Sequence, residues 1–200
     1  MTHTEHVHLL FGIGLALTGA LWLGGQTVAP RLRFVWPIVL FAVGFFLVIS
    51  TETQERTYAQ VDAWHTFLSV FPDSFAVWLT SVQKFHVIQH KITGMCAMAA
   101  GAIEEARACG FLSADRWRLA LPVLTIGAGL AIGIHGGTHQ HLPHLVERAH
   151  HWILGGALLL GGAVQAVATG RQPAHPAWLR VLPALVLVSG LDLALFYRLR

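Results

Sequence analysis

Histidine is the residue type in this sequence that is best suited to chemistry. The chain of 200 residues contains 13 His, as many as Lys and Arg together, although only 12% of its residues are charged. Imidazole is a common ligand of transition metals and of haem iron, and its charge changes close to neutral pH. The His content therefore favours metal ligation, haem ligation or pH sensing.

Spacing gathers these His into sets that could bind a metal. Imidazoles four residues apart lie on one face of a helix, and this spacing joins His86 to His90 and His135 to His139. The candidate ligands are His8, His86, His90, His135, His139, His141, His144, His150 and His151. We expect first capture of the ion by His135, His139, His141 and His144. We expect a site at the membrane mouth from His86, His90, His150 and His151, with His8 nearby.

Two carboxylates accompany the candidate ligands. Asp192 lies inside an apolar run. A charged group is costly there and by default indicates a functional site. We expect its partner to be a His of the cluster or an Arg. Glu147 stands four residues before His151. We expect both carboxylates to orient the His ligands or balance the charge of the ion.

Other interpretations of single residues remain open. One His at a helix mouth is more often an interfacial polar residue than a ligand, but six His between positions 135 and 151 favour ligation. A pH sensor is the main other use of such a cluster. Cys96 and Cys109 have no CxxC spacing, so no disulfide framework or thiolate site is indicated. Met95, Cys96 and Met98 are expected to pack rather than to relay a soft metal.

The composition is typical of a membrane protein. Hydrophobic residues make up 54% of the chain and the mean hydropathy is +0.59, which nearly excludes a water-soluble enzyme. The net charge of +3 comes without a basic patch interleaved with aromatics, so nucleic acid is not an expected partner and the lipid bilayer is. Six runs are long enough to cross the bilayer as helices: 8–25, 33–50, 86–106, 117–136, 150–169 and 177–197.

Lys and Arg predict the orientation of these spans. Seven of the 13 lie in three connections on one side of the membrane: Arg31, Arg33, Arg107, Arg116, Arg118, Arg171 and Arg180. Because cytoplasmic loops are enriched in Lys and Arg, we expect a bacterial inner-membrane protein with both termini extracytoplasmic. Twelve of the 13 His then lie on the extracytoplasmic face, and only His175 lies on the other.

The six runs share a pattern that predicts an all-α fold of three tandem helical hairpins. The odd runs contain His-x3-Gly-x6-Gly-Ala, beginning at His8, His90 and His151. The even runs contain Pro-x6-Gly, beginning at Pro37, Pro122 and Pro183. We expect hairpins over 1–50, 86–139 and 140–200, the last including the His-rich loop. Segment 51–85 has the apolar stripe of an amphipathic helix and is expected to lie in the extracytoplasmic interface, as a gate or a simple anchor.

The repeated glycines have two interpretations. Glycines seven residues apart return to nearly the same helix face, where a missing side chain admits a neighbouring helix or a flat cofactor. Helix packing is the more common use. A haem slot is the alternative, in which His90 and His151 ligate haem b from two helices, backed by Gly94 and Gly155.

Two short motifs resemble families of copper-handling membrane proteins. His8 followed by Leu21-Trp22-Leu23-Gly24-Gly25 resembles the opening helix of the bacterial copper resistance protein D family, inner-membrane proteins implicated in moving copper across that membrane. His86-Val87-Ile88-Gln89-His90 is similar to a His-x-x-Gln-His element of membrane proteins that help load copper into caa3-type cytochrome oxidase. The resemblance implies copper as the metal, with His8, His86 and His90 as its ligands.

These observations predict an integral membrane protein whose extracytoplasmic His cluster binds a transition metal, copper first, for transport, resistance or delivery to a metalloenzyme. We expect a metal-handling protein rather than an enzyme. The alternative is a b-type haem subunit of a quinone-linked oxidoreductase. A third interpretation is a structural subunit whose His face docks a periplasmic partner.

Overall fold

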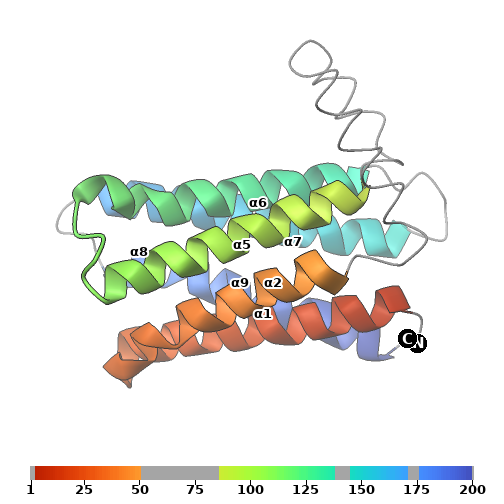
Figure 1. Cartoon of the computed structure of the whole chain (residues 1–200). Helices are drawn as coiled ribbons and strands as arrows, with labels where there is room; N and C mark the ends of the chain where they lie inside the picture. The colour runs from red at the N-terminus through yellow and green to blue at the C-terminus, as the bar shows by residue number, and fades with distance from the viewer. Residues whose placement is uncertain (1–2, 51–85, 138–144, 171–175, 200) are drawn as a thin grey trace, which may run out of the picture.

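The structure is a bundle of long helices that run alongside one another (Figure 1). The computed structural model describes residues 3–50, 86–137, 145–170 and 176–199, and every regular element in them is helical. The long helices are α1 (His3–Thr27), α2 (Trp36–Ser50), α5 (His86–Ala108), α6 (Ala120–Gly137), α7 (Leu145–Gly170) and α9 (Val181–Leu199). They stand where the six apolar runs predicted them. The expected amphipathic segment 51–85 lies outside the described residues.

Short helical turns lead into three of the long helices, α2, α6 and α9. These are η1 (Pro30–Phe34) before α2, η2 (Asp115–Leu119) before α6 and α8 (Pro176–Leu179) before α9. Pro37, Pro122 and Pro183 each lie in the first turn of the long helix that follows. A proline is tolerated there because the first amides of a helix have no intrahelical acceptor. These prolines therefore mark the starts of the three helices.

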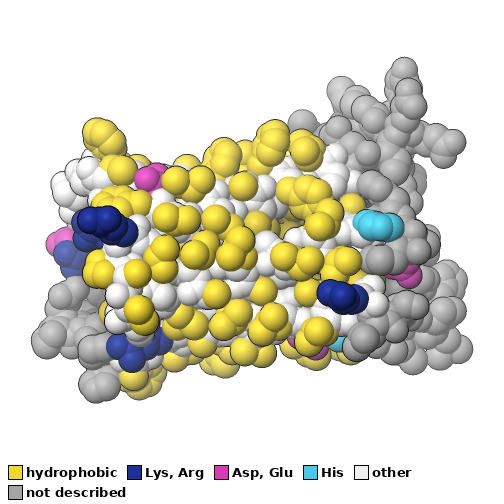
Figure 2. All heavy atoms as spheres, turned by 90° about the horizontal axis from the view of Figure 1, so that it is seen from below, with side chains coloured by type: hydrophobic (Ala, Val, Ile, Leu, Met, Phe, Trp, Pro, Cys, Tyr) yellow, Lys and Arg dark blue, Asp and Glu magenta, His cyan; other side chains and the backbone are white. Residues whose placement is uncertain are grey.

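The surface of the bundle is apolar along its length (Figure 2). Five of the helical segments are long and apolar enough to cross a membrane: Glu5–Thr27, Pro30–Ser50, Asp115–Ile134, Arg148–Gly170 and Ala177–Arg198. Helix α5, with 23 residues, has the length of a span but carries Lys91 near its start and Glu104, Glu105 and Arg107 near its end. Exposed side chains such as Leu10, Phe45 and Val188 belong to the surface that a bilayer would cover. Length and apolar surface together are those of a protein that spans a membrane.

Glycine brings the helices together in three close pairs, α1 with α9, α2 with α5 and α6 with α7. A Cβ atom added to a glycine of α1, α5 or α7 would lie within 3.0 Å of a carbonyl oxygen on the paired helix, as at Gly12 with Gly190, Gly94 with Gly44 and Gly155 with Gly129. Two turns further along, the added atom would meet a proline carbonyl, at Gly19 with Pro183, Gly101 with Pro37 and Gly162 with Pro122. The glycines thus serve helix packing, and the space expected of a haem slot beside Gly94 and Gly155 is filled by neighbouring backbone.

The two ends of the bundle differ in charge. Helices α1, α5 and α7 begin at the end where both termini lie, and this end, called the His end below, carries His6, His8, His90, His150 and His151 (Figure 1). The opposite end, the Arg end, is made by η1, η2 and α8 and carries Arg31, Arg33, Arg116, Arg118 and Arg180. Figure 2 shows most of the Lys and Arg in view at the Arg end, and His at the other. The predicted segregation of His therefore holds for the described residues.

We predict that Gly155→Ala lowers stability whereas Gly156→Ala does not. A Cβ atom at Gly155 would lie 2.9 Å from the backbone nitrogen of Gly133, so α6 and α7 must move apart, at a cost of about 1–3 kcal/mol. Gly156, the next residue of the same helix, has open space around it, and alanine there should gain up to about 1 kcal/mol of helix propensity. Thermal unfolding in detergent measures both. Equal unfolding temperatures would contradict glycine-mediated packing.

Candidate metal centre

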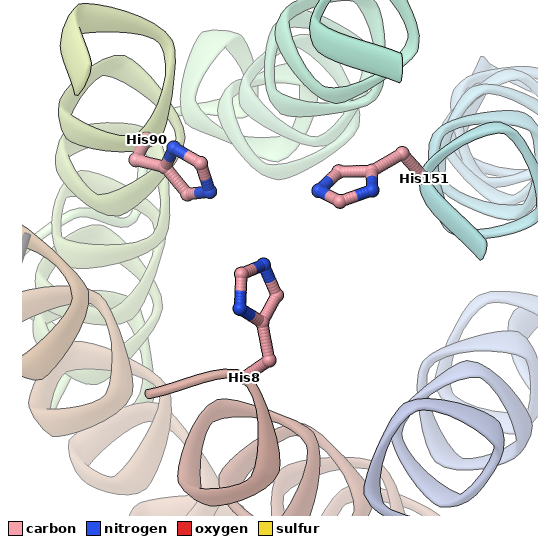
Figure 3. A group of neighbouring side chains, drawn as sticks. All are labelled: His8, His90 and His151. Carbon is pink, nitrogen blue, oxygen red and sulfur yellow. The ribbon is translucent and has the colours of Figure 1, made fainter. Parts of the chain in front are cut away.

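Three imidazoles from three helices meet at the His end of the bundle. His8 on α1, His90 on α5 and His151 on α7 point toward a common centre (Figure 3). One ligand atom from each ring lies within 4.8 Å of the others. The ring centroids are 5.8 Å apart for His8 and His90, 5.6 Å for His8 and His151, and 6.3 Å for His90 and His151. We refer to these three residues as the histidine triad.

The triad sits over a small apolar cavity. His151 is buried, with 8% of its surface exposed, and His8 and His90 are partly buried. The cavity, called the triad cavity, has a volume of about 30 Å³. Besides the three His and His150, its lining comprises Val7, Phe11, Leu47, Gln89, Thr93, Ala131, Ile132, Leu154 and Leu193. An ion or one or two water molecules would fit there, and a porphyrin would not.

An aromatic side chain holds one member of the triad in place. Tyr197, near the end of α9, stacks on His8 with a centroid distance of 4.8 Å and an interplanar angle of 23°. Only 2% of Tyr197 is exposed, and the ring of Phe196 packs edge-on against it. Our reading of the sequence missed Tyr197. One signal was present, because Tyr197 follows Gly190 by seven residues and so lies on nearly the same face of α9.

His150 is directed to a carboxylate rather than to the triad. Its Nδ1 lies 2.6 Å from Oδ2 of Asp192 on α9, and the exposed fractions of the two side chains are 12% and 38%. Neighbouring residues of a helix point about 100° apart, so His151 can face the bundle axis while His150 faces α9. Asp192 thus has a His partner, one of the two partners expected for it. The pair ties α7 to α9 beside the triad, and the Phe196 ring packs 4.0 Å from the His150 ring.

The other predicted ligands are placed less fully. His86 begins α5, His135 lies in the last turn of α6 and Glu147 lies in the first turn of α7, so their backbone is at the His end. His139, His141 and His144 lie outside the described residues. Among described side chains, the predicted membrane-mouth set is therefore divided into His8, His90 and His151, which converge, and His150, which pairs with Asp192.

The triad has the donor set and nearly the spacing of a three-His metal site. Imidazole nitrogens that lie 2.0–2.1 Å from one ion stand roughly 3.3–3.6 Å apart. The triad atoms, within 4.8 Å of each other, reach that spacing through small rotations of the rings. Three protein ligands leave a further coordination position open for water or another small ligand. Gln89 and Thr93 on α5 add polar groups to the cavity below.

Comparison with known proteins adds no relative. The chain matches no protein-family model, no curated protein and no solved structure. The functional argument therefore depends on the chemistry of the site itself and on the short copper-family motifs in the sequence.

We predict that Asp192→Ala destabilises the bundle more than Asp115→Ala. Loss of the 2.6 Å contact leaves His150 partly buried without its carboxylate, at a cost of about 1 kcal/mol after allowance for the exposure of Asp192. The control pair, Asp115 with Arg118, is 3.1 Å apart, but Asp115 is 86% exposed and water replaces its contact readily. Thermal unfolding of both variants is the measurement. A smaller effect at Asp192 than at Asp115 would show that the His150 contact contributes nothing.

Proposed function

We propose that this protein is a membrane metal-binding protein whose histidine triad holds one transition-metal ion at the His end of the bundle. The observation that carries the proposal is the convergence of His8, His90 and His151, from helices far apart in sequence, with ligand atoms within 4.8 Å. Neutral imidazole is a common ligand of transition metals. Three of them at this spacing can share one ion.

Copper is the metal we propose. Neutral imidazole suits copper, zinc, nickel and iron, and the triad includes no thiolate or carboxylate that would favour a different class. His8 and His90 are also two of the three residues carried by the resemblance to copper-handling families. The carboxylate of Asp192, held by His150 on the neighbouring stretch of α7, adds negative charge close to the site. This charge favours a bound cation.

Binding or delivery of the ion fits the interior of the bundle better than passage through it. Further along the bundle axis lies a second cavity, whose lining among the described residues includes no charged side chain. An ion entering it would lose its ligands without replacement, which is costly in a membrane interior. We therefore propose that the ion enters and leaves at the His end, where His135, His139, His141 and His144 would capture it. Copper resistance and delivery to a metalloenzyme are both consistent with such a site.

The haem alternative is less well supported by the geometry. Two axial His need a flat slot between their helices for the porphyrin. The His90 and His151 rings are 6.3 Å apart, but His8 lies within 5.8 Å of both, in the space a porphyrin would need. Gly94 and Gly155, expected to back the haem, lie against Gly44 and Gly129 instead. These contacts favour a single ion over haem b.

We infer further that the chain consists of three tandem copies of one helical hairpin. In support, the glycine contacts have the same register in the three close helix pairs. Apart from the triad and Ala131, the lining of the triad cavity falls into sets of three at equivalent positions: Val7, Gln89 and His150; Phe11, Thr93 and Leu154; Leu47, Ile132 and Leu193. Such a repeat explains the triad, because equivalent residues of three copies meet at their common axis.

We predict that the triad residues are required for copper binding and that His6 is not. His8→Ala, His90→Ala and His151→Ala each remove one ligand, and the affinity for copper should fall by at least about 100-fold. His6→Ala is the matched control, because His6 is exposed at the same end of the same helix as His8. Metal analysis and copper titration of the purified protein make the test. Undiminished binding in the triad variants, or a Soret band in the wild-type protein, would overturn the proposed site.

We predict that the Arg end faces the cytoplasm, as the positive-inside rule indicates. Cys109 is an exposed free thiol at that end, whereas Cys96 is partly buried within α5. A membrane-impermeant maleimide should therefore leave Cys109 unmodified in intact spheroplasts and modify it after permeabilisation. Cys109→Ser serves as the control for the labelled site. Equal labelling before and after permeabilisation would reverse the orientation and put the histidine triad on the cytoplasmic side.

A further inference from the structure

The second cavity lies on the bundle axis, between the triad and the Arg end. This axial cavity has a volume of about 60 Å³ and is lined by residues of α1, α2, α5, α6, α7 and α9. Phe11, Thr93 and Ile132 line both cavities, so they separate the axial cavity from the triad cavity. Toward the Arg end its lining includes Trp22, which stacks on Trp36 at a centroid distance of 4.1 Å. The cavity is thus adjacent to the proposed metal site, and Trp22 forms part of its wall toward the Arg end.

The threonine hydroxyls in its lining present no free hydrogen-bond donor to the space. Three threonines line it, and each hydroxyl donates to a carbonyl one turn earlier in its own helix, Thr18 to Gly14 at 2.8 Å, Thr93 to Gln89 at 2.9 Å and Thr125 to Leu121 at 2.8 Å. Cys96 contributes a thiol, which is a weak donor. The indole of Trp22 carries one N–H group, the other lining residues are apolar, and among the described residues none is charged.

A cavity with this lining selects its occupant by polarity and size. Water needs two to four polar partners to be held, and an ion needs more, so neither is favoured there. Apolar cavities stay dry and admit small apolar ligands such as xenon. Such molecules dissolve in hydrocarbon, so the bilayer around the helices supplies them. The available volume suits a molecule of two heavy atoms rather than a lipid chain.

We propose that the axial cavity is a binding site for a small uncharged apolar molecule, of the size and polarity of dioxygen or carbon monoxide. When an ion occupies the triad, a molecule in this cavity is separated from the triad cavity by Phe11, Thr93 and Ile132. That second statement rests on the proposed function. Occupancy of the cavity itself does not, because the residues that line it away from the triad bind no metal.

Xenon tests the proposal in the metal-free protein. Crystals of the full chain under xenon pressure should show an anomalous peak between Phe11, Ala100 and Ala128. Ala100→Leu fills the cavity and should abolish this peak, because Ala100 lines the cavity and is 4% exposed. Ala102→Leu is the matched control, two residues along α5 but exposed, and should leave the peak unchanged. Ala128→Leu, on α6, gives a second filled variant if the first fails to fold.

The outcomes separate this inference from the metal proposal. Absence of a xenon peak in the wild-type cavity, or a peak of undiminished height in a folded filled variant, overturns the inference whatever the metal content. Xenon binding in a protein whose triad takes up no copper would leave the inference intact and overturn the proposed function instead.

Discussion

The close approach of helix backbones at glycine is the interaction on which the rest of this structure depends. Between apolar helices in a membrane, burial of apolar surface contributes little to association, so close packing of atoms must hold them together. At Gly12, Gly94 and Gly155 the partner's carbonyl lies where a side chain would begin. These contacts fix the rotation of α1, α5 and α7 about their axes and their positions along the bundle. The triad residues stand one turn before these glycines, so the same contacts bring the three imidazoles to one level.

The ion pairs of the described residues lie toward the two ends of the bundle. The ion pairs Glu104 with Arg107 and Asp115 with Arg118 lie at or near the Arg end. At the His end, Asp192 lies with His150, and Tyr197 covers His8. Charged groups are costly in hydrocarbon, so a site that must exchange ions with water belongs at an end of the bundle. The triad lies at such an end, and its imidazoles are buried or partly buried. In the proposed function they would replace water molecules as ligands of the ion.

The two cavities divide the proposed chemistry between them. The triad cavity has imidazoles on one side and Gln89 within its wall, which suits an ion with a small polar ligand. In the axial cavity the threonine hydroxyls are all bonded to their own helices, which leaves an apolar surface. In the proposed function an ion would be held at the first and excluded from the second, whereas an uncharged apolar molecule would have the opposite preference. The ion at the triad and the apolar molecule in the axial cavity would therefore lie on opposite sides of Phe11, Thr93 and Ile132.

The sequence by itself determined the helices, the prolines at their starts, the apolar surface and the gathering of His at one end of the bundle, because each depends on local composition and period. It also marked His8, His90 and His151, among nine candidate His, as equivalent positions that could converge if the three hairpins pack around a common centre. Convergence requires the rotation of each helix, and only the tertiary contacts of α1 with α9, α2 with α5 and α6 with α7 set that rotation. The same contacts decided that the glycines pack helices, that His150 turns to Asp192 and that Tyr197 covers His8. Helix pairing joins residues far apart in the chain, and a pattern of period 3.6 specifies which face is buried but not against which neighbour.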